Sequence, residues 1–224
     1  MAETNNAADA TARRPAASRQ LQPLALLAAR HIAIDTHVAR YFCCVDWEPH
    51  LRVAFDARLH VADAVHQELK DQCHGVPKIN EFLALPRYWD LEQPETLEEH
   101  QMVSDLQRGW EEKNGLPYDA YHNLGEAEAL VICARKRNRD AGWTFVTNDH
   151  DATDSAKLLR VPVCNPFFLV ALFVHQGYID QTEAWLGYQA MVNNHGMLGF
   201  LWLGAKSEDG KAFRERLGTV LANV

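Results

Sequence analysis

The feature that most constrains the fold is a short apolar run, Trp143 to Val146, which leads directly into an acidic stretch. An apolar run of this length and composition indicates a buried β-strand. A second such run, His31 to Asp35, lies near the start of the chain and also ends in an acid. Helical patterns follow both runs. Strands that alternate with helices predict an α/β fold with a short, mostly parallel sheet.

Helical patterns dominate the rest of the chain. In residues 95–113, Val103, Leu106 and Trp110 recur at the spacing of one helix face. A brief strand is expected at residues 160–164. The expected helices are residues 36–44, 58–71, 95–113, 124–137, 151–159 and 165–177, with two or three more within 180–224.

One domain with helical additions accounts for this pattern more simply than two domains do. We expect the domain to span residues 29–180 and a helical extension, residues 181–224, to pack on it. Residues 1–28 contain Ala, Thr and Arg but lack the continuous apolar segment of a secretory signal. We therefore expect a disordered tail there.

The composition restricts the functional class. The formal net charge of −8 argues against a protein that mainly coats nucleic acid, because phosphate binding depends on Lys and Arg. No apolar run is long enough to span a bilayer, so we expect no membrane role. The five cysteines include no Cys-x-x-Cys pair, which favours a reducing cytoplasm over a disulfide framework or a zinc site.

Two acids lie where the clearest predicted strands end. Asp35 closes the first strand, and Asp149 follows the run from Trp143 to Val146. Ligands bind outside the carboxyl ends of parallel strands, so neighbouring strands would present both carboxylates at one edge. Helix capping is the competing interpretation. Asp151 and Asp154 have the spacing of an N-cap with an acid three residues later; we assign capping to Asp154 and leave Asp151 open.

A third acid, Glu68, lies on the apolar face of a predicted helix. Residues three, four and seven positions apart are neighbours on a helix, and those before Glu68 are Val65, Ala64 and Val61. Asp63 instead has polar neighbours and belongs on the solvent-exposed side. Charged residues are rarely buried without a partner, so a carboxylate on this face requires an explanation.

The same test separates two glutamates in the segment GEAEAL. Glu126 is followed at three, four and seven positions by Ala129, Leu130 and Cys133, which form a buried face. Glu128 looks toward a face that becomes polar. Two residues correspond to about 200° of rotation on a helix, so the two side chains cannot point at one place. We predict that Glu126 belongs to the site.

These acids need compensating charge if they converge. No basic residue lies beside Asp35, Glu126 or Asp149 in the sequence. Like charges about 4 Å apart repel by roughly 4 kcal/mol at an effective dielectric constant near 20. A divalent cation would remove this repulsion, and ligands that are all oxygen favour Mg²⁺ or Mn²⁺.

Four segments, in this order, resemble the motifs of PIN-domain nucleases, the fold of VapC-type toxins in bacterial toxin–antitoxin pairs. The segments are IAIDTHVARYF with Asp35, LHVADAVHQELK with Glu68, LGEAEALVICA with Glu126, and FVTND with Asp149. The third segment is closest to a branch that carries Gly-Glu-Ala-Glu-Ala. The resemblance covers residues 31 to about 200, with residues 85–122 poorly matched. It implies a three-layer α/β/α domain with extra C-terminal helices.

The resemblance also implies an activity, that of a metal-dependent endoribonuclease that hydrolyses RNA phosphodiester bonds with two Mg²⁺ or Mn²⁺ ions. The implied metal ligands are Asp35, Glu68, Glu126 and Asp149, with Asp151 matching a further acid that is often present. The residues implied to contact these ligands or the substrate are Thr36, Thr147 and Asn148.

Partners are implied less directly. Arg135, Lys136, Arg137 and Arg139 are candidate RNA contacts, although a solvated helix end explains this basic run equally well. An antitoxin protein and a homodimer are the partners that the resemblance suggests besides RNA. The alternative function is a PIN-like module that binds nucleic acid or protein without turnover.

Overall fold

The computed structural model describes residues 29–55, 58–84, 91–140, 142–195 and 210–222. The expected disordered tail, residues 1–28, lies outside these ranges. Within them the chain forms an α/β fold whose strands all run parallel. The strands are β1 (His31–Ile34), β2 (Leu59–Ala62), β3 (Leu91–Glu92), β4 (Trp143–Val146) and β5 (Val163–Cys164).

The described strands are arranged in the order β3-β2-β1-β4-β5. Of the three predicted strands, β1 and β4 lie side by side at the centre, with Ile34 opposite Val146, and the third, expected at residues 160–164, is β5. Every residue of β4 is buried, as is typical of a parallel strand covered on both faces. The chain leaves β1 toward β2 and leaves β4 toward β5, so the connections diverge between the two central strands.

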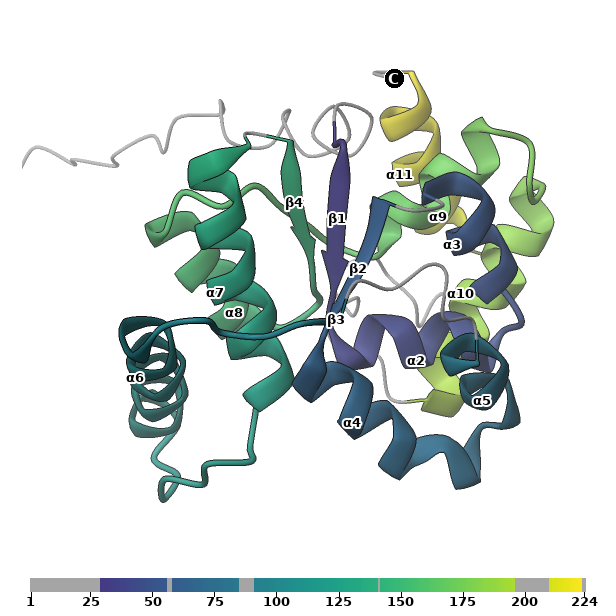
Figure 1. Cartoon of the computed structure of the whole chain (residues 1–224). Coiled ribbons are helices and arrows are strands. Elements are labelled where there is room, and N and C mark those ends of the chain that lie inside the picture. Colours follow the sequence, from purple (N-terminus) through teal and green to yellow (C-terminus); the bar gives the residue numbers. More distant parts are fainter. Residues whose placement is uncertain (1–28, 56–57, 85–90, 141, 196–209, 223–224) are drawn as a thin grey trace, which may run out of the picture.

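Helices cover both faces of the sheet (Figure 1). On one side lie α6 (Leu97–Lys113), α7 (Leu124–Arg139) and α8 (His150–Leu158). The opposite side carries α2 (Thr36–Cys44), α3 (Glu48–Phe55), α5 (Pro77–Leu83) and α9 (Phe167–His175). Helix α4 (Asp63–Gln72) runs below the carboxyl ends of the strands and contacts both α2 and α7. It is followed by a short 3₁₀ turn, Cys73–Gly75.

The two described helices of the C-terminal extension pack on the same side as α2. Helix α10 (Gln181–His195) contacts α2 and α9, and α11 (Lys211–Leu221) contacts α9. An aromatic cluster joins them, in which Tyr188 of α10 lies 4.9 Å from Phe213 of α11 between ring centroids. No described helix has the length and apolar character needed to cross a membrane.

One predicted element is wrong in part. Residues 58–71 were expected to be a single helix, but residues 59–62 form strand β2 and the helix begins at Asp63. The four residues of β2 are all buried between β1 and β3, and pairing with these strands satisfies their backbone in place of helical hydrogen bonds. The sequence also did not predict α3, α5 or the two-residue strand β3.

Candidate functional site

The site lies where the central strands β1 and β4 end. Asp35 is the first residue after β1, and its backbone N–H donates to the carbonyl of Val146, the last residue of β4, at 3.3 Å. Asp149 follows β4 by three residues. The connections diverge at this point of the sheet, which is where open α/β folds hold their ligands. The expectation that Asp35 and Asp149 share one edge is therefore met.

Asp35 is fully buried and caps helix α2. Its Oδ1 accepts a hydrogen bond from Val38 N at 2.6 Å. Its Oδ2 is buried and has no hydrogen-bond partner of ordinary geometry among the described residues. Burial, followed by the negative charge of Glu126, raises the pKa of Asp35 to about 7; the charge of His37 and then the Thr147 hydroxyl oppose this only in part. One carboxylate oxygen is thus held by a backbone hydrogen bond, while the other has no hydrogen bond of ordinary geometry among the described residues.

Asp149 caps helix α8 in the same way. Its Oδ1 accepts from Ala152 N at 2.6 Å, and its own N–H donates to the Thr147 hydroxyl at 2.9 Å. Burial and then the charges of Glu126 and Asp151 raise the pKa of Asp149. Capping by Asp154 was the prediction, and it is wrong, because α8 begins at His150, earlier than its sequence pattern indicates.

Glu68 reaches the site from helix α4. Its Oε1 accepts from Gly125 N at 2.9 Å, and its Oε2 accepts a short hydrogen bond from the Thr36 hydroxyl. Burial raises the pKa of Glu68, and the negative charge of Glu126 contributes in the same direction. Val65 is buried on the same face as predicted, but Val61, which the helical spacing had included, belongs to β2.

Glu126 is buried in the first turn of α7 and lies among the other three acids. Burial is the main cause of the raised pKa values of Asp35, Glu68 and Asp149. Among the neighbouring carboxylates, Glu126 contributes most to each of these shifts. Each of the four acids comes from a different segment of the chain. The structure therefore places Asp35, Glu68 and Asp149, three of the acids that the sequence analysis selected, within electrostatic reach of the fourth, Glu126.

His37 is a member of the site that the sequence analysis missed. Its Nδ1 lies 3.0 Å from Glu126 Oε1. The hydrogen bond to Glu126 raises the pKa of His37 to about 9, with help from the charges of Asp35 and Glu68. The statement that no basic residue lies near Asp35 in sequence is therefore wrong: His37 is two residues away, in the first turn of α2. It offsets only part of the charge of four carboxylates.

Two other acids that were left open are engaged elsewhere. Glu128 Oε2 accepts from Ala64 N at 3.1 Å, where it caps the start of α4 in place of the uncharged Ala62. Asp151 accepts a short hydrogen bond from Lys113 and a second from Asn114 Nδ2 at 2.8 Å. Lys113 lowers the pKa of Asp151, whereas the pKa values of Asp35, Glu68 and Asp149 are raised.

The predicted supporting residues have defined positions. Thr36 and Thr147 are both buried, and their hydroxyls hold Glu68 and the backbone of Asp149 respectively. Asn148 is half-buried. Burial raises the pKa of the Tyr41 hydroxyl, and a hydrogen bond from the Asn148 side chain opposes this shift.

The basic run lies away from the acids. Arg135 is nine residues after Glu126 on α7, which is about 13 Å along the helix axis. Arg135 is buried, and its guanidinium lies 3.0 Å from both Glu92 and Glu99. Lys136 pairs with Glu92 at 2.6 Å. Of the other two members of the run, Arg137 is half-buried and Arg139 is exposed.

The four acids provide the type of donor atom that a hard divalent cation prefers, but their side chains are not arranged as a metal site. Among the described residues, no three His, Cys, Asp or Glu side chains are already disposed as metal ligands. The donor set nevertheless consists of carboxylate oxygens, the type that Mg²⁺ and Mn²⁺ prefer. The buried Oδ2 of Asp35 without a hydrogen bond is the atom that most requires such a partner.

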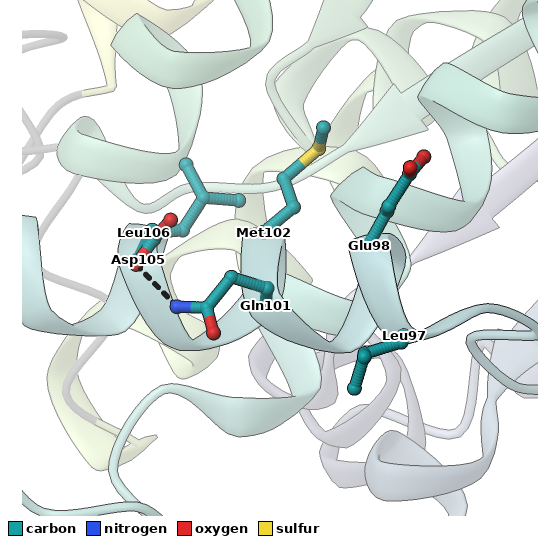
Figure 2. A pocket seen from close by; sticks show the side chains of 6 residues that line it. All are labelled: Leu97, Glu98, Gln101, Met102, Asp105 and Leu106. Atoms are coloured by element: carbon teal, nitrogen blue, oxygen red, sulfur yellow. Dashed lines mark hydrogen bonds between the residues drawn. The ribbon is translucent and has the colours of Figure 1, made fainter.

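A hollow lies on the outer face of α6, away from these acids. It has a volume of about 590 Å³, and its described lining comes from α6 alone (Figure 2). Gln101 donates to Asp105 there at 2.8 Å, while Met102 and Leu97 provide apolar surface. No catalytic combination of groups faces it, so the acids at the strand ends remain the candidate site.

Comparison with known proteins leaves this site to be interpreted from its own chemistry. No protein-family model matches the chain. Searches of curated proteins and of solved structures also give no match.

Proposed function

We propose that this chain is a metal-dependent endoribonuclease with a PIN-like fold. The observation that carries the proposal is the convergence of Asp35, Glu68, Glu126 and Asp149 at the ends of β1 and β4, with His37 as a single basic contact. Burying several carboxylates together costs stability unless a cation joins them. Such an arrangement is typical of a catalytic site rather than of a structural core.

In this proposal the acids bind metal, and the neighbouring hydroxyls and His37 orient them. Asp35, Glu68, Glu126 and Asp149 hold Mg²⁺ or Mn²⁺, and the hydroxyls of Thr36 and Thr147 keep two of these acids in place. Bound cations supply electrophilic stabilisation of the phosphodiester oxygens and a more acidic water. His37, protonated at neutral pH because its pKa is about 9, orients Glu126 through Nδ1. The acids bind and orient and do not attack phosphorus themselves.

Cleavage of a generic RNA is the direct test. A labelled single-stranded RNA is incubated with the protein in Mn²⁺, in Mg²⁺ and in EDTA, and the products are separated on a denaturing gel. We expect cleavage in either metal and none in EDTA. A melting curve that is unchanged across millimolar Mn²⁺ would argue against the site, because a ligand that binds only the folded state raises its melting temperature.

A gel-shift experiment with the same RNA distinguishes the nuclease from the alternative function. A binding module without turnover would shift the RNA in this experiment yet leave it intact in both metals. Activity on a DNA of the same sequence shows whether the substrate is RNA alone. The role as a toxin and the antitoxin partner stay predictions that rest on the sequence resemblance.

A further inference from the structure

Two histidines lie close together near the amino ends of the central strands, at the opposite edge of the sheet from the four acids (the acid site). His31 begins β1, and His60 is the second residue of β2. The sheet register places Ala33 beside His60 and His31 beside Trp143, and side chains two residues apart on a strand share a face. The side chains of His31, His60 and Trp143 therefore lie on one face of the sheet.

The two imidazoles meet through their ring nitrogens. His31 Nδ1 lies 2.9 Å from His60 Nε2, although the residues are 29 positions apart in the sequence. Two nitrogens that bind one Zn²⁺ ion at about 2.0–2.1 Å lie about 2.8–3.4 Å apart, for angles of about 90° to 110° at the metal. The separation in the structure falls within the range for two ligands of one cation.

A carboxylate behind His31 prepares its Nδ1 for a metal. Asp140 Oδ2 lies 3.8 Å from His31 Nε2, and Asp140 Oδ1 accepts from Gly142 N at 3.0 Å. The carbonyl of Gly142 accepts in turn from His31 N at 3.0 Å. A carboxylate on this side favours a hydrogen on Nε2, which leaves the lone pair of Nδ1 on the side of His60. Histidines that bind metals commonly donate their other N–H to a carboxylate in this way.

Packing holds both rings in place and leaves one of them accessible. The Trp143 ring stacks on His31 at 5.0 Å between centroids and tilts against His60 at 4.3 Å. His60 is buried, whereas the side chain of His31 is 32% exposed. Lys136 lies over the same Trp143 ring, but its charge is compensated by Glu92 at 2.6 Å. A cation can therefore reach the pair from the exposed side of His31 without meeting an uncompensated charge on Lys136.

We propose that His31 and His60 bind a transition-metal ion of the group Zn²⁺, Ni²⁺ and Cu²⁺, with Asp140 orienting His31 from behind. Imidazole nitrogens suit these ions, whereas the carboxylate oxygens of the acid site suit Mg²⁺ and Mn²⁺. Water supplies the remaining ligands. The ion joins β1 to β2 and, through Asp140, to the C-terminal end of α7. It stabilises the amino edge of the sheet and takes no part in the proposed nuclease activity.

Nickel binding tests the proposal directly. Isothermal titration calorimetry follows Ni²⁺ binding to the untagged full chain in saturating Mg²⁺, and we expect one Ni²⁺ per chain. Asp140→Asn should weaken this binding by about 10- to 100-fold, the cost of losing a carboxylate that orients a ligating histidine. His31→Gln and His60→Gln should weaken it further, because each removes one of the two nitrogens. His175→Gln, at an exposed position, should bind Ni²⁺ like the parent.

An electron paramagnetic resonance spectrum of the parent with one equivalent of Cu²⁺ needs no substitution, so it is unaffected if a variant at buried His60 fails to fold. Coupling of the copper to two nitrogen nuclei supports the proposal. A spectrum typical of oxygen ligands alone overturns it.

The remaining outcomes distinguish this site from the acid site. Variants of His31 and His60 that are folded by circular dichroism and bind Ni²⁺ as tightly as the parent overturn the proposal, as does a parent that binds no Ni²⁺ at millimolar concentration. Loss of Ni²⁺ binding in His31→Gln with an unchanged effect of Mn²⁺ on the melting temperature supports two separate sites. Loss of both effects in this variant shows one shared site and overturns the proposal.

Discussion

The buried charges at the two ends of helix α7 are compensated to different extents by neighbouring side chains. At the C-terminal end, buried Arg135 lies 3.0 Å from both Glu92 and Glu99, and Lys136 adds a second cation beside Glu92. At the N-terminal end, Glu126 lies among three other carboxylates, and His37 is its basic contact. One helix therefore has a neutralised end and an end with excess negative charge.

The difference shows how structural charge can be distinguished from functional charge. A buried ion pair whose partners all belong to the chain leaves an uncompensated charge when one partner is lost, so it ties together the elements that it joins, here β3, α6 and α7. In the proposed function, the buried acids at the other end find their compensating charge in a bound cation. Substitutions at the two ends should consequently act on different properties.

The largest effect is expected from Glu126→Gln. The substitution keeps the shape of the side chain and removes the negative charge that the proposed function assigns to metal binding. The initial rate on labelled RNA in Mn²⁺ should therefore fall by more than about 100-fold, since loss of even an outer partner of a metal ligand costs about 10- to 100-fold. Glu128→Gln is the matched control, because it retains an acceptor for Ala64 N and should keep most of the activity. Equal losses in two folded variants would contradict the assignment of Glu126.

At the opposite end, Arg135→Met should reduce stability and spare the chemistry. It leaves Glu99 without this buried cation and Glu92 with Lys136 alone, and loss of one partner of a buried pair costs about 3–5 kcal/mol. Urea unfolding measures this cost, while the Mn²⁺-induced shift in melting temperature should stay unchanged. Arg139→Met, at an exposed position, should change stability by less than about 0.5 kcal/mol. An Arg135 variant as stable as the parent would remove the contrast between the two ends.

Asp35→Asn should stabilise the metal-free protein. Asparagine still caps α2 but carries no charge, so it removes the cost of burying a charge and the repulsion by Glu126, which together raise the pKa of Asp35; a gain of about 1–3 kcal/mol is expected near pH 8. The shift in melting temperature caused by Mn²⁺ should shrink in the same variant. Asp63→Asn, at an exposed position in the first turn of α4, controls for loss of one negative charge. A variant that melts below the parent in EDTA would contradict a strained acid site.

The last prediction concerns a change of stability with pH. The pKa of Asp35 is raised from 3.8 to about 7, so between these values the folded state binds more protons than the unfolded state, and stability falls as pH rises. The pKa of His37 is raised from 6.5 to about 9, so its contribution is present below 6.5 and is lost as pH rises through about 9. Both groups act in the same direction.

The melting temperature in EDTA should therefore decrease from pH 5 to pH 9. Saturating Mn²⁺ competes with protons for the acids and should reverse this slope between pH 5 and pH 7, because only deprotonated carboxylates bind the metal. Parallel curves with and without Mn²⁺ would show that the titrating groups do not bind it. The Asp35→Asn variant should show a flatter curve in EDTA.

Much of the fold was predictable where a local pattern decides the structure. The apolar runs at β1 and β4, and the periodic helices α6 and α7, were identified because burial of these residues leaves a sequence signal. Strand β2 was not identified, because its apolar residues continue into α4 without a break that propensity could detect. The two residues of β3 are too few to give any periodicity.

The residues of the candidate site were likewise predictable only where local sequence patterns determine their positions. Strand ends and helix faces were enough to select the four acids, since each depends on local geometry. The contact of His37 with Glu126 joins residues 89 positions apart, and that of Arg135 with Glu92 joins residues 43 apart, so no local pattern contains them. Partners of charged groups are set by the packing of whole elements, which is why the sequence predicted the acids better than their neutralisation.

Gly125 lowers the intrinsic helix stability of the first turn of α7 but leaves space for Glu68 and Val65. A Cβ atom at this position would lie 2.9 Å from both Glu68 Oε2 and Val65 Cγ2, closer than atoms approach in proteins. Alanine would favour the helix by about 0.5–1 kcal/mol, yet even a methyl group would push α4 and α7 apart or displace the carboxylate. This contact between the two helices thus favours glycine, and a chain that exchanged it would keep its helices while shifting the alignment between them.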